Sequence, residues 1–517
     1  MKEIKLTKKT NIIICAAMFL LMAALIYKNC IRHLSRSVAF SYGLVLSIVV
    51  IVGTIAAYWL YSNRRLALHW TYSLIAFSLG LFYMFMIPMY TVPDEAVHIR
   101  KAYEVSNVLM GIEDDPSDGL VMRREDAKYV ATNQTLPIEA TDYKFEDAFK
   151  MAQDTELIDT ELVPYDDAGY QYFVPALGVT LGRLLGLGTM SMLLMGRLFN
   201  LIMFVGVVTL AIYLIPKHKM ILVTIGLFPM TLQQGMSFSY DSFINAFAFL
   251  LFALIVRYSL QEDYLRAREL IILALVLLLI LPTKHFAYFS LVLLPFMLLF
   301  KNKLHKREKI IVVTLIVLGL GLMAWDKIVP SLIAGPATEA IEDPDAGKHI
   351  IKWANEEGYT IGYLLAHPDR IPAIIIATLS TWYKFYLGTM VGDRLCWLEV
   401  RIPVIAALCL ALAIFMNFFG LNEEPEKELT RKDKIIMLIA ALISIACIFA
   451  GMLLSWTPIS YLDIQGVQGR YFLPILPLIM VIFRTKRIKL GEWAPQVMLL
   501  LMIVGNYITA QNLIDRW

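Results

Sequence analysis

The sequence is poor in charge and in cysteine. Of its 517 residues 17% are charged and 58% are hydrophobic, whereas soluble globular proteins are roughly 25% charged. Its five cysteines form neither a disulfide framework nor a metal-binding spacing. No phosphate-binding glycine loop and no dinucleotide fingerprint occurs, and the basic segments carry no sign of nucleic-acid binding. These absences argue against a soluble enzyme, a disulfide-stapled domain, a tightly held metal and a nucleic-acid partner.

Long apolar runs dominate the chain instead. Many are about 17–24 residues long, enough to cross a hydrocarbon core of about 30 Å as a helix. We therefore predict an all-α polytopic membrane protein with about thirteen transmembrane helices. The candidate spans are 11–27, 39–61, 71–90, 192–214, 220–233, 240–259, 268–282, 285–300, 309–327, 402–420, 434–456, 471–483 and 494–512.

Short basic clusters predict the orientation, because cytoplasmic loops are enriched in Lys and Arg. The clusters are Lys217 and Lys219, then Lys301 to Lys309, then Arg484 to Lys489. Placing them in the cytoplasm with the N-terminus leaves no crossing for the apolar run 371–388. Pro372 near its start and aromatic residues near its end favour an interfacial or re-entrant helix. We expect a multi-pass membrane protein with a cytoplasmic N-terminus and its long loops outside.

The expected organisation has five parts: N-terminal helices (1–90), a first extracytoplasmic loop (91–191), a central bundle (192–327), a second extracytoplasmic loop (328–401) and C-terminal helices (402–517). Within 91–172, nineteen Asp or Glu face seven Lys or Arg, and interspersed aromatic residues indicate a folded region. Near its end, Leu177, Leu181, Leu184 and Leu185 share one helical face, which predicts a short helix lying along the membrane.

Unusual polar residues gather near the predicted outer boundary. Asp94 and Glu95 follow the third span directly, where charge costs about 2.5–3.5 kcal/mol on insertion scales. Such a pair is either an interfacial cap or part of a site. The other candidates are His98, Arg183, Arg197, Tyr240, Asp241, Asn245, Lys284, His285, Gln468, Arg470 and Tyr471. Arg197 inside a span needs a partner, for which Asp241 would suffice. Arg470 stands at a helix N-terminus, which favours an anion such as phosphate, or it reaches to the interface.

Several segments resemble a family of bacterial multispanning proteins known as domain of unknown function 2142. The matching text is Pro93-Asp-Glu-Ala-Val-His98, Pro175 to Gly186, Gly196-Arg-Leu-Phe-Asn200, Ser239-Tyr-Asp-Ser-Phe-Ile-Asn245, Cys396-Trp-Leu-Glu399 and Gly466-Val-Gln-Gly-Arg-Tyr471. The layout is also similar to the GT-C glycosyltransferases, which carry an acid at the start of a large first outer loop and use polyprenyl-phosphate sugars. Three spans precede the loop here, unlike in the simplest members.

The GT-C likeness implies sugar transfer from a polyprenyl-phosphate donor to a cell-envelope glycan or other acceptor, with inversion. Asp94 would then be the base and Glu95 would orient it or bind sugar hydroxyls. Arg470 with Lys284, and Arg183 or Arg197, would neutralise the donor phosphate. No cofactor is required, although a divalent cation (Mg or Mn) is compatible. The alternatives are a lipid-linked glycan flippase or transporter, a glycan polymerase or ligase, and a noncatalytic scaffold.

Overall fold

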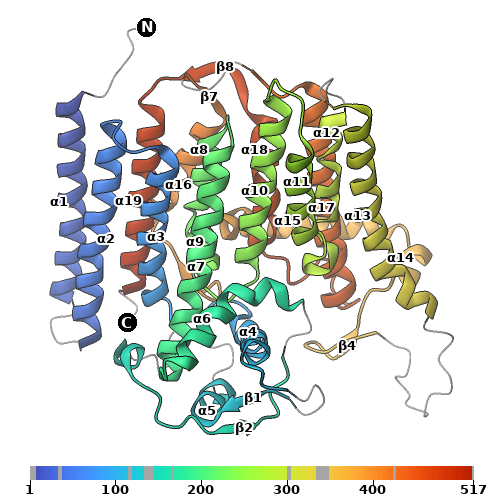
Figure 1. Cartoon of the computed structure of the whole chain (residues 1–517), viewed down its shortest axis with the longest axis horizontal. Helices are drawn as coiled ribbons and strands as arrows, with labels where there is room; N and C mark the ends of the chain where they lie inside the picture. Colours follow the sequence, from blue (N-terminus) through green and yellow to red (C-terminus); the bar gives the residue numbers. More distant parts are fainter. Residues whose placement is uncertain are drawn as a thin grey trace. The chain divides into compact units, whose positions relative to one another are not determined.

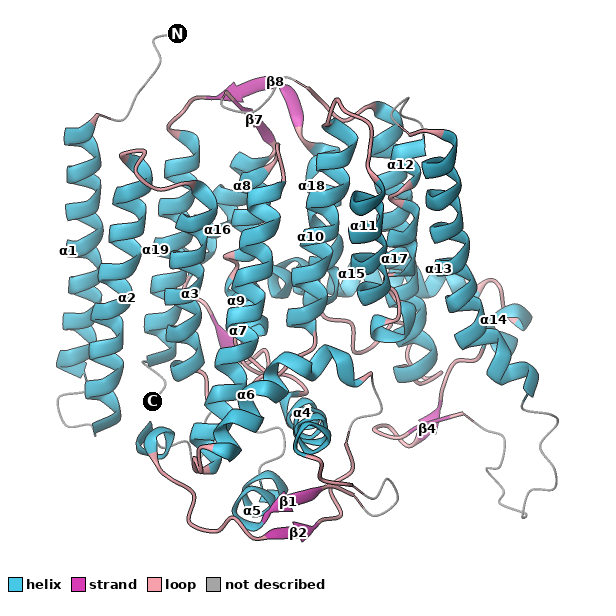
Figure 2. Cartoon of the chain, viewed as in Figure 1, coloured by secondary structure: helices cyan, strands magenta, loops and turns pink. Residues whose placement is uncertain are grey.

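The structure is a computed structural model that describes residues 7–32, 38–114, 119–132, 145–164, 168–299, 304–333, 349–422 and 427–514. Lys301 and Lys303 of the second basic cluster lie outside these ranges, as does 334–348 of the predicted second outer loop. The described chain is mostly helical, with short two-stranded sheets and no larger one among the described residues (Figures 1 and 2). It divides into two compact units.

The first unit comprises Met1–Leu250, Val391–Glu424 and Arg484–Trp517. Its helices are α1 (Lys8–Arg32), α2 (Val38–Ser62), α3 (Leu68–Met86), α4 (Glu95–Met110), α5 (Arg124–Thr132), η2 (Phe145–Phe149), η3 (Gly169–Tyr172), α6 (Phe173–Leu184), α7 (Thr189–Leu214), α8 (Lys219–Gly226), α9 (Pro229–Gly235), α16 (Val404–Asn417) and α19 (Ala494–Ile514). The helix α10 (Asp241–Leu260) begins in this unit and continues into the second. Helix α3 packs on α2 and α7, and α19 packs on α16.

Short strand pairs close the loops of this unit. The strands β1 (Val121–Arg123) and β2 (Leu157–Asp159) pair antiparallel within the first long loop, and β5 (Arg394–Leu395) pairs with β6 (Val400–Arg401). At the other end, β7 (Phe419–Leu421) pairs in parallel with β8 (Thr485–Leu490). The Arg484 side chain donates to the Phe419 carbonyl and contacts His218 Nδ1. Two of the three predicted basic clusters, those around Lys217 and Arg484, therefore lie side by side.

The second unit comprises Leu251–Met390 and Pro425–Phe483. Its elements are α11 (Ala267–Ile280), η4 (Thr283–Phe286), η5 (Phe289–Leu293), α12 (Phe296–Leu299), α13 (Lys306–Ile333), β3 (Ile350–Ile351), β4 (Glu356–Glu357), α14 (Ile361–Ala366), α15 (Arg370–Val391), α17 (Arg431–Trp456), η6 (Gly469–Ile475) and α18 (Leu476–Phe483). The strands β3 and β4 pair antiparallel. Helix α17 packs on α18 and η5, and α13 packs on η5 and α11.

Seven helices of the described chain are long and apolar enough to cross a membrane: α1, α2, α3, α7, α10, α17 and α19. The remaining predicted spans contain helices too, but most are short or broken. The run 220–233 is divided into α8 and α9 because Pro229 opens a new helix. Pro474 lies inside η6, so the run 471–483 is divided as well. Helix length and composition therefore support a multi-pass membrane protein, but they do not support all thirteen predicted spans.

The run 371–388 forms most of α15, which is absent from the seven. In Figure 2 α15 is drawn across the axes of α11, α13 and α17, its neighbours in the same unit. One face is bonded to the chain before η6: Thr378 Oγ1 accepts from the Ile464 N–H, and Thr389 Oγ1 accepts from the Gly469 N–H. The helix also exposes large apolar side chains, namely Ile371, Ile375, Ile376, Leu379, Tyr383 and Leu387. This pattern suits the interfacial helix that the sequence predicts.

The helix pair α6–α7 depends on two glycines spaced four residues apart. A Cβ added at Gly178 would lie 2.4 Å from the Met195 carbonyl oxygen, and one at Gly182 would lie 2.9 Å from Met192 Cα. Small residues at this spacing let two helix backbones approach closely. The four leucines predicted to share one face of α6 are exposed on its other side. The packing thus fixes α6 against the end of α7 that carries Arg197.

We expect Gly178→Ala to lower the thermal stability of the detergent-purified protein, at a cost of about 1–3 kcal/mol for overpacking. The matched control is Gly206→Ala, also within this helix pair, where an added Cβ would meet nothing within 4 Å. That control should be neutral or slightly stabilising, since Ala is the better helix former. Equal melting temperatures for the two variants would contradict the close α6–α7 contact.

Candidate functional site

A buried ion pair joins α4 to α7 at the end of α3. Arg197 Nε donates to Glu95 Oε1 at 2.9 Å and Arg197 Nη2 donates to Glu95 Oε2 at 2.6 Å, with both side chains 0% exposed. The sequence suggested Asp241 as the partner of Arg197, and the structure corrects this to Glu95. The bidentate geometry suits a guanidinium in a low-dielectric interior, where an unpaired charge is very costly.

The same two side chains also hold the turn between α3 and α4. Arg197 donates to the carbonyls of Met84, Ile87 and Pro88 at 3.3, 2.6 and 3.0 Å. The last carbonyls of a helix lack partners within it, so this arginine satisfies groups that a membrane would leave bare. Glu95 in turn accepts from the Tyr90 N–H at 3.0 Å. Because these contacts occupy its guanidinium, Arg197 is not available to bind a donor phosphate.

Asp94 lies directly before Glu95 of this buried ion pair. It is exposed, whereas Pro93 and Glu95 on either side are buried. Its backbone lies in the left-handed region with φ 63° and ψ 8°, and its side chain makes no capping hydrogen bond to α4. Asp tolerates this region better than most residues, but the conformation remains uncommon and often marks functional positions. The two adjacent acids thus have opposite surroundings: Glu95 is buried and paired, and Asp94 faces outward.

A histidine–tyrosine cluster lies one helical turn beyond Asp94. His98 is buried, and its Nδ1 lies 2.8 Å from the Tyr172 hydroxyl. The Tyr240 ring stands edge-on to the imidazole with centroids 4.8 Å apart. His98 is four residues after Asp94, so the cluster lies in the first turn of α4. Among the described residues no group of His, Cys, Asp and Glu could hold a metal ion.

The start of α10 adds buried polar groups to this unit. Asp241 is 5% exposed, and its backbone N–H donates to Ser239 Oγ at 3.2 Å. Asn245, one turn later, is 1% exposed, and neither its Nδ2 nor its Oδ1 has a hydrogen-bond partner among the described residues. A buried amide without partners costs about 1–3 kcal/mol. Asn245 is therefore a good candidate for a ligand contact.

Arg183 belongs to the interface between α4 and α6. Its Nη1 donates to Ser106 Oγ at 2.9 Å and to Asn107 Oδ1 at 2.7 Å, and the guanidinium lies 4.4 Å from the centroid of the Tyr103 ring. Burial lowers the pKa of Arg183, although the charges of Tyr103 and Asp126 act the other way. These contacts hold Arg183 in a packing role within the first long loop.

A second buried ion pair, which the sequence did not predict, lies in that loop. Arg123 and Asp126 form a bidentate pair with Nε–Oδ2 2.6 Å and Nη2–Oδ1 3.0 Å. Asp126 also accepts from the Tyr103 hydroxyl and from Thr189 Oγ1, at the first residue of α7. Arg123 and Asp126 are only three residues apart, but nothing in the sequence marks the pair as buried, because the Tyr103 and Thr189 contacts that enclose it come from other parts of the chain.

Glu125 caps the same helix end. Burial raises the pKa of its carboxyl, but the backbone N–H groups of Gln153, Thr189 and Asp154 outweigh that effect and lower it overall. Thr189 opens α7, so the carboxylate sits against the positive end of the helix dipole. The first long loop is thus bonded to the start of the helix that carries Arg197.

Gln233 is another position without a sequence signal. Its side chain is buried; Oε1 accepts from the Cys396 N–H at 2.7 Å and Nε2 donates to the Cys396 carbonyl at 3.4 Å. These two hydrogen bonds hold the β5–β6 hairpin, where Cys396 and Leu398 have φ of 57° and 64°. Burial raises the pKa of the Cys396 thiol to about 12, although a hydrogen bond with Thr91 opposes the rise. Cys396 is therefore a packed thiol and not a nucleophile.

Two cations meet around one aromatic ring in the second unit. Lys284 Nζ lies 3.9 Å and Arg470 Cζ lies 5.3 Å from the centroid of the Tyr471 ring. Lys284 and His285 both have φ of 51°, so the backbone is strained there, and His285 is exposed. Gln468 precedes η6, and its buried Oε1 has no hydrogen-bond partner among the described residues. Lys284, Gln468, Arg470 and Tyr471 are hereafter called the cation cluster.

One known protein family matches most of the chain. The model of the family described as "Predicted membrane protein (DUF2142)" matches residues 77–479, which contain Asp94, the ion pair and the cation cluster. The chain belongs to this family. Among curated proteins and among solved structures, no match was found. The DUF2142 match confirms the family that the sequence motifs suggested, and its description assigns no reaction.

We expect Glu95→Gln and Arg197→Gln each to destabilise this DUF2142 protein by about 3–5 kcal/mol, because each leaves an uncompensated buried charge. The control is Glu104→Gln, also on α4, which breaks the partly exposed Lys101–Glu104 pair and should cost about 1 kcal/mol or less. Thermal melting in detergent measures all three. A Glu95→Gln variant as stable as the control would show that the ion pair does not support the fold.

Proposed function

We propose that the protein is a GT-C-type glycosyltransferase that moves a sugar from a polyprenyl-phosphate donor to a cell-envelope acceptor at the outer face of the bacterial plasma membrane. In this proposal the short and broken apolar segments cross the membrane together with the seven long helices, which gives thirteen crossings. The observation that carries the proposal is Asp94: an exposed carboxylate, held in a left-handed turn beside a fully buried ion pair, at the end of an apolar helix.

The reaction needs a base and a group that stabilises the leaving phosphate. The Asp94 carboxylate takes the proton of the acceptor hydroxyl as its oxygen attacks the anomeric carbon. The bond from that carbon to the phosphate oxygen breaks, and its electron pair leaves with the polyprenyl phosphate. A single displacement of this kind inverts the anomeric carbon. Glu95 acts as a positioning residue through its bonds to the turn, and a divalent cation is not needed for the step.

The remaining candidates divide the other tasks. Lys284 and Arg470 of the cation cluster receive the donor phosphate, because two cations beside a tyrosine suit an anionic group next to an apolar chain. His98, Tyr240 and Asn245 are assigned to sugar hydroxyls, for which hydrogen-bonding side chains beside aromatic rings are suited. Arg183 and Arg197 are left with structural roles, since their guanidinium groups are committed to neighbouring residues.

Asp94→Asn should abolish transfer and leave folding intact, since the side chain is exposed. The measurement is linkage analysis and mass spectrometry of envelope glycans from a deletion strain complemented with wild type or variant. We expect wild type to restore a sugar decoration that Asp94→Asn does not. Asp159→Asn is the matched control, because it removes another exposed acid of the same loop and should restore the decoration.

Arg470→Gln should weaken use of the lipid donor. Losing one charge-assisted contact to phosphate costs about 1.5–3 kcal/mol, or roughly 10–150-fold in apparent affinity. The measurement is the donor KM in membranes, using the sugar identified by the glycan analysis, with Arg370→Gln as the control for an exposed arginine of the same unit. Unchanged donor kinetics in Arg470→Gln would show that the cation cluster does not bind the donor phosphate.

A transporter or lipid-linked glycan flippase is the second candidate, and one observation favours it. The break between α8 and α9 comes eight residues after Lys219, about 12 Å along the helix axis. Thr231 Oγ1 and Gln234 Oε1 in α9 are buried without a hydrogen-bond partner among the described residues. Broken helices with polar groups at mid-membrane depth are typical of transporters. Because a transporter has no need of the Asp94 acid, full restoration of the glycan by Asp94→Asn would favour this candidate.

A further inference from the structure

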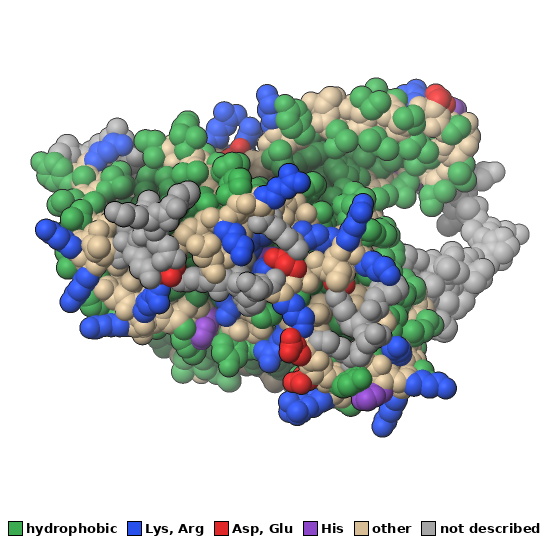
Figure 3. Space-filling model, turned by 90° about the horizontal axis from the view of Figure 1, so that it is seen from above, with side chains coloured by type: hydrophobic (Ala, Val, Ile, Leu, Met, Phe, Trp, Pro, Cys, Tyr) green, Lys and Arg blue, Asp and Glu red, His purple; other side chains and the backbone are tan. Residues whose placement is uncertain are grey.

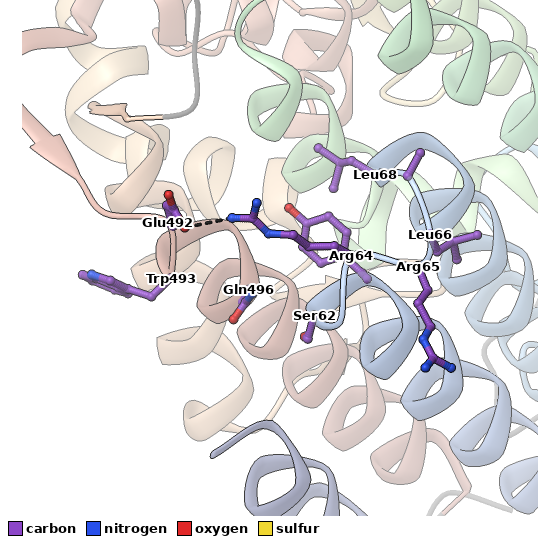
Figure 4. A pocket seen from close by; sticks show the side chains of 10 residues that line it. Ser62, Arg64, Arg65, Leu66, Leu68, Glu492, Trp493 and Gln496 are labelled. Atoms are coloured by element: carbon purple, nitrogen blue, oxygen red, sulfur yellow. Dashed lines mark hydrogen bonds and ion pairs between the residues drawn. The ribbon is translucent and has the colours of Figure 1, made fainter. Parts of the chain in front are cut away.

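A pocket lies at the end of the first unit opposite to Asp94. It is a cavity of about 600 Å³ between the α2–α3 loop and the start of α19 (Figure 4). The lining residues are Tyr61, Ser62, Arg64, Arg65, Leu66, Ala67, Leu68, Glu492, Trp493 and Gln496. The candidate site lies near the other end of α3, which at 19 residues is about 28 Å long. The pocket is therefore a separate site.

Three helices long enough to span a membrane end at this pocket. Helix α2 ends at Ser62, α3 begins at Leu68 and α19 begins at Ala494. Trp59 in the last turn of α2 and Trp493 just before α19 are at the level where tryptophans form an interfacial belt. The pocket therefore sits at the depth of the lipid headgroups. The charge asymmetry of the sequence assigns this end to the cytoplasm.

The charges of the pocket favour an anion. Arg64 Nη2 contacts Glu492 Oε2 at 2.8 Å, and the arginine side chain is 74% exposed. Arg65 extends in another direction (Figure 4), and its guanidinium lies 5.4 Å from the centroid of the Trp59 ring. The lining thus contains two guanidinium groups and one carboxylate, that of Glu492. Lys and Arg side chains also gather on the face that Figure 3 shows, among few acids.

Two further features suit a headgroup that carries hydroxyls. The side-chain carbonyl oxygen of Gln496 is buried in the wall and has no hydrogen-bond partner among the described residues, so it is ready to accept from a ligand. Arg64 has φ 57°, an uncommon conformation for a side chain of this size. The turn directs Arg64 toward Glu492 across the pocket (Figure 4).

We propose that this pocket binds the headgroup of an anionic phospholipid that carries free hydroxyls, such as a phosphoglycerol. Arg64 contacts the phosphate oxygens, for which the guanidinium fork is well matched, and Arg65 adds a second positive charge to the lining. Gln496 and Glu492 accept from the headgroup hydroxyls, and the acyl chains lie along the apolar ends of α2 and α3. In the absence of lipid, Glu492 neutralises Arg64 and so competes with the phosphate. The binding site is independent of the proposed transferase reaction.

The test uses the purified full-length protein in a neutral detergent and native mass spectrometry with phosphatidylglycerol or phosphatidylcholine. Wild type should bind phosphatidylglycerol more tightly than phosphatidylcholine. Each basic residue near a membrane surface contributes about 1 kcal/mol, so Arg64→Gln/Arg65→Gln should weaken the first binding event by roughly 25-fold. The matched control is Arg487→Gln/Lys489→Gln on β8, two exposed cations of the same unit, which should bind nearly as wild type does.

A third variant keeps the test decisive if the double variant fails to fold. Glu492→Gln removes the competing carboxylate and should tighten phosphatidylglycerol binding severalfold, whereas a merely structural role for Glu492 would weaken it. Equal losses in the Arg64/Arg65 and Arg487/Lys489 variants would overturn the proposal in favour of general surface charge. Binding of glycerol 1-phosphate as tight as that of the lipid would overturn it in favour of a soluble phosphate ester.

Discussion

The ion pair between Glu95 and Arg197 is the interaction on which the rest of the candidate site depends. Arg197 supplies donors to Glu95 and to three carbonyls at the end of α3. Glu95 accepts hydrogen bonds from the backbone N–H groups of Tyr90 and Phe238, and Phe238 precedes α10. One pair thus joins α3, α4, α7 and the approach to α10. In a low-dielectric interior these groups cannot find water, so each must find the others.

The position of Asp94 follows from this arrangement. Asp94 precedes the first helical residue of α4, and its left-handed backbone leaves its side chain exposed while Glu95 is buried. The left-handed backbone at Asp94 persists because the residues on both sides are fixed. The first long loop adds to the rigidity, because Asp126 and Glu125 bond to the first residue of α7. A base held by its surroundings loses little freedom when the acceptor binds, which is what general-base catalysis requires.

Much of the fold could be predicted from hydrophobic runs, because the bilayer sets their length. Every predicted span contains a helix, and the leucine face of α6 is exposed as expected. The breaks at Pro229 and Pro474 were missed because averaging hydropathy along a run hides a single proline. The partner of Arg197 was also missed. Depth in the membrane suggested Asp241, but the pairing is set by the turn before α4, which brings residues 102 positions apart together.

The candidate residues illustrate the same limit. Asp94, His98 and Asn245 were identified as unusual polar groups. Asp94 is exposed, His98 contacts the Tyr172 hydroxyl, and the Asn245 amide has no hydrogen-bond partner in the part of the chain that the structure describes. Gln233 escaped notice because its importance lies in contacts with Cys396, 163 positions away, which leave no periodic trace. Arg123 is only three residues from Asp126, but no sequence pattern marks that pair as buried. Arg183, which the GT-C likeness assigned to the donor phosphate, bonds to Ser106 and Asn107 between α4 and α6.

The most direct test of the account is the sugar-transfer activity of Arg197→Lys, measured at equal amounts of folded protein. Lysine keeps the charge beside Glu95 but loses the planar fork that reaches the carbonyls of Met84, Ile87 and Pro88. If the ion pair positions Asp94, the variant should stay folded and lose most of its transfer activity, as a turn displaced by about 1 Å can cost 100-fold. Wild-type transfer by folded Arg197→Lys would contradict the claim that this arginine positions Asp94, the proposed base.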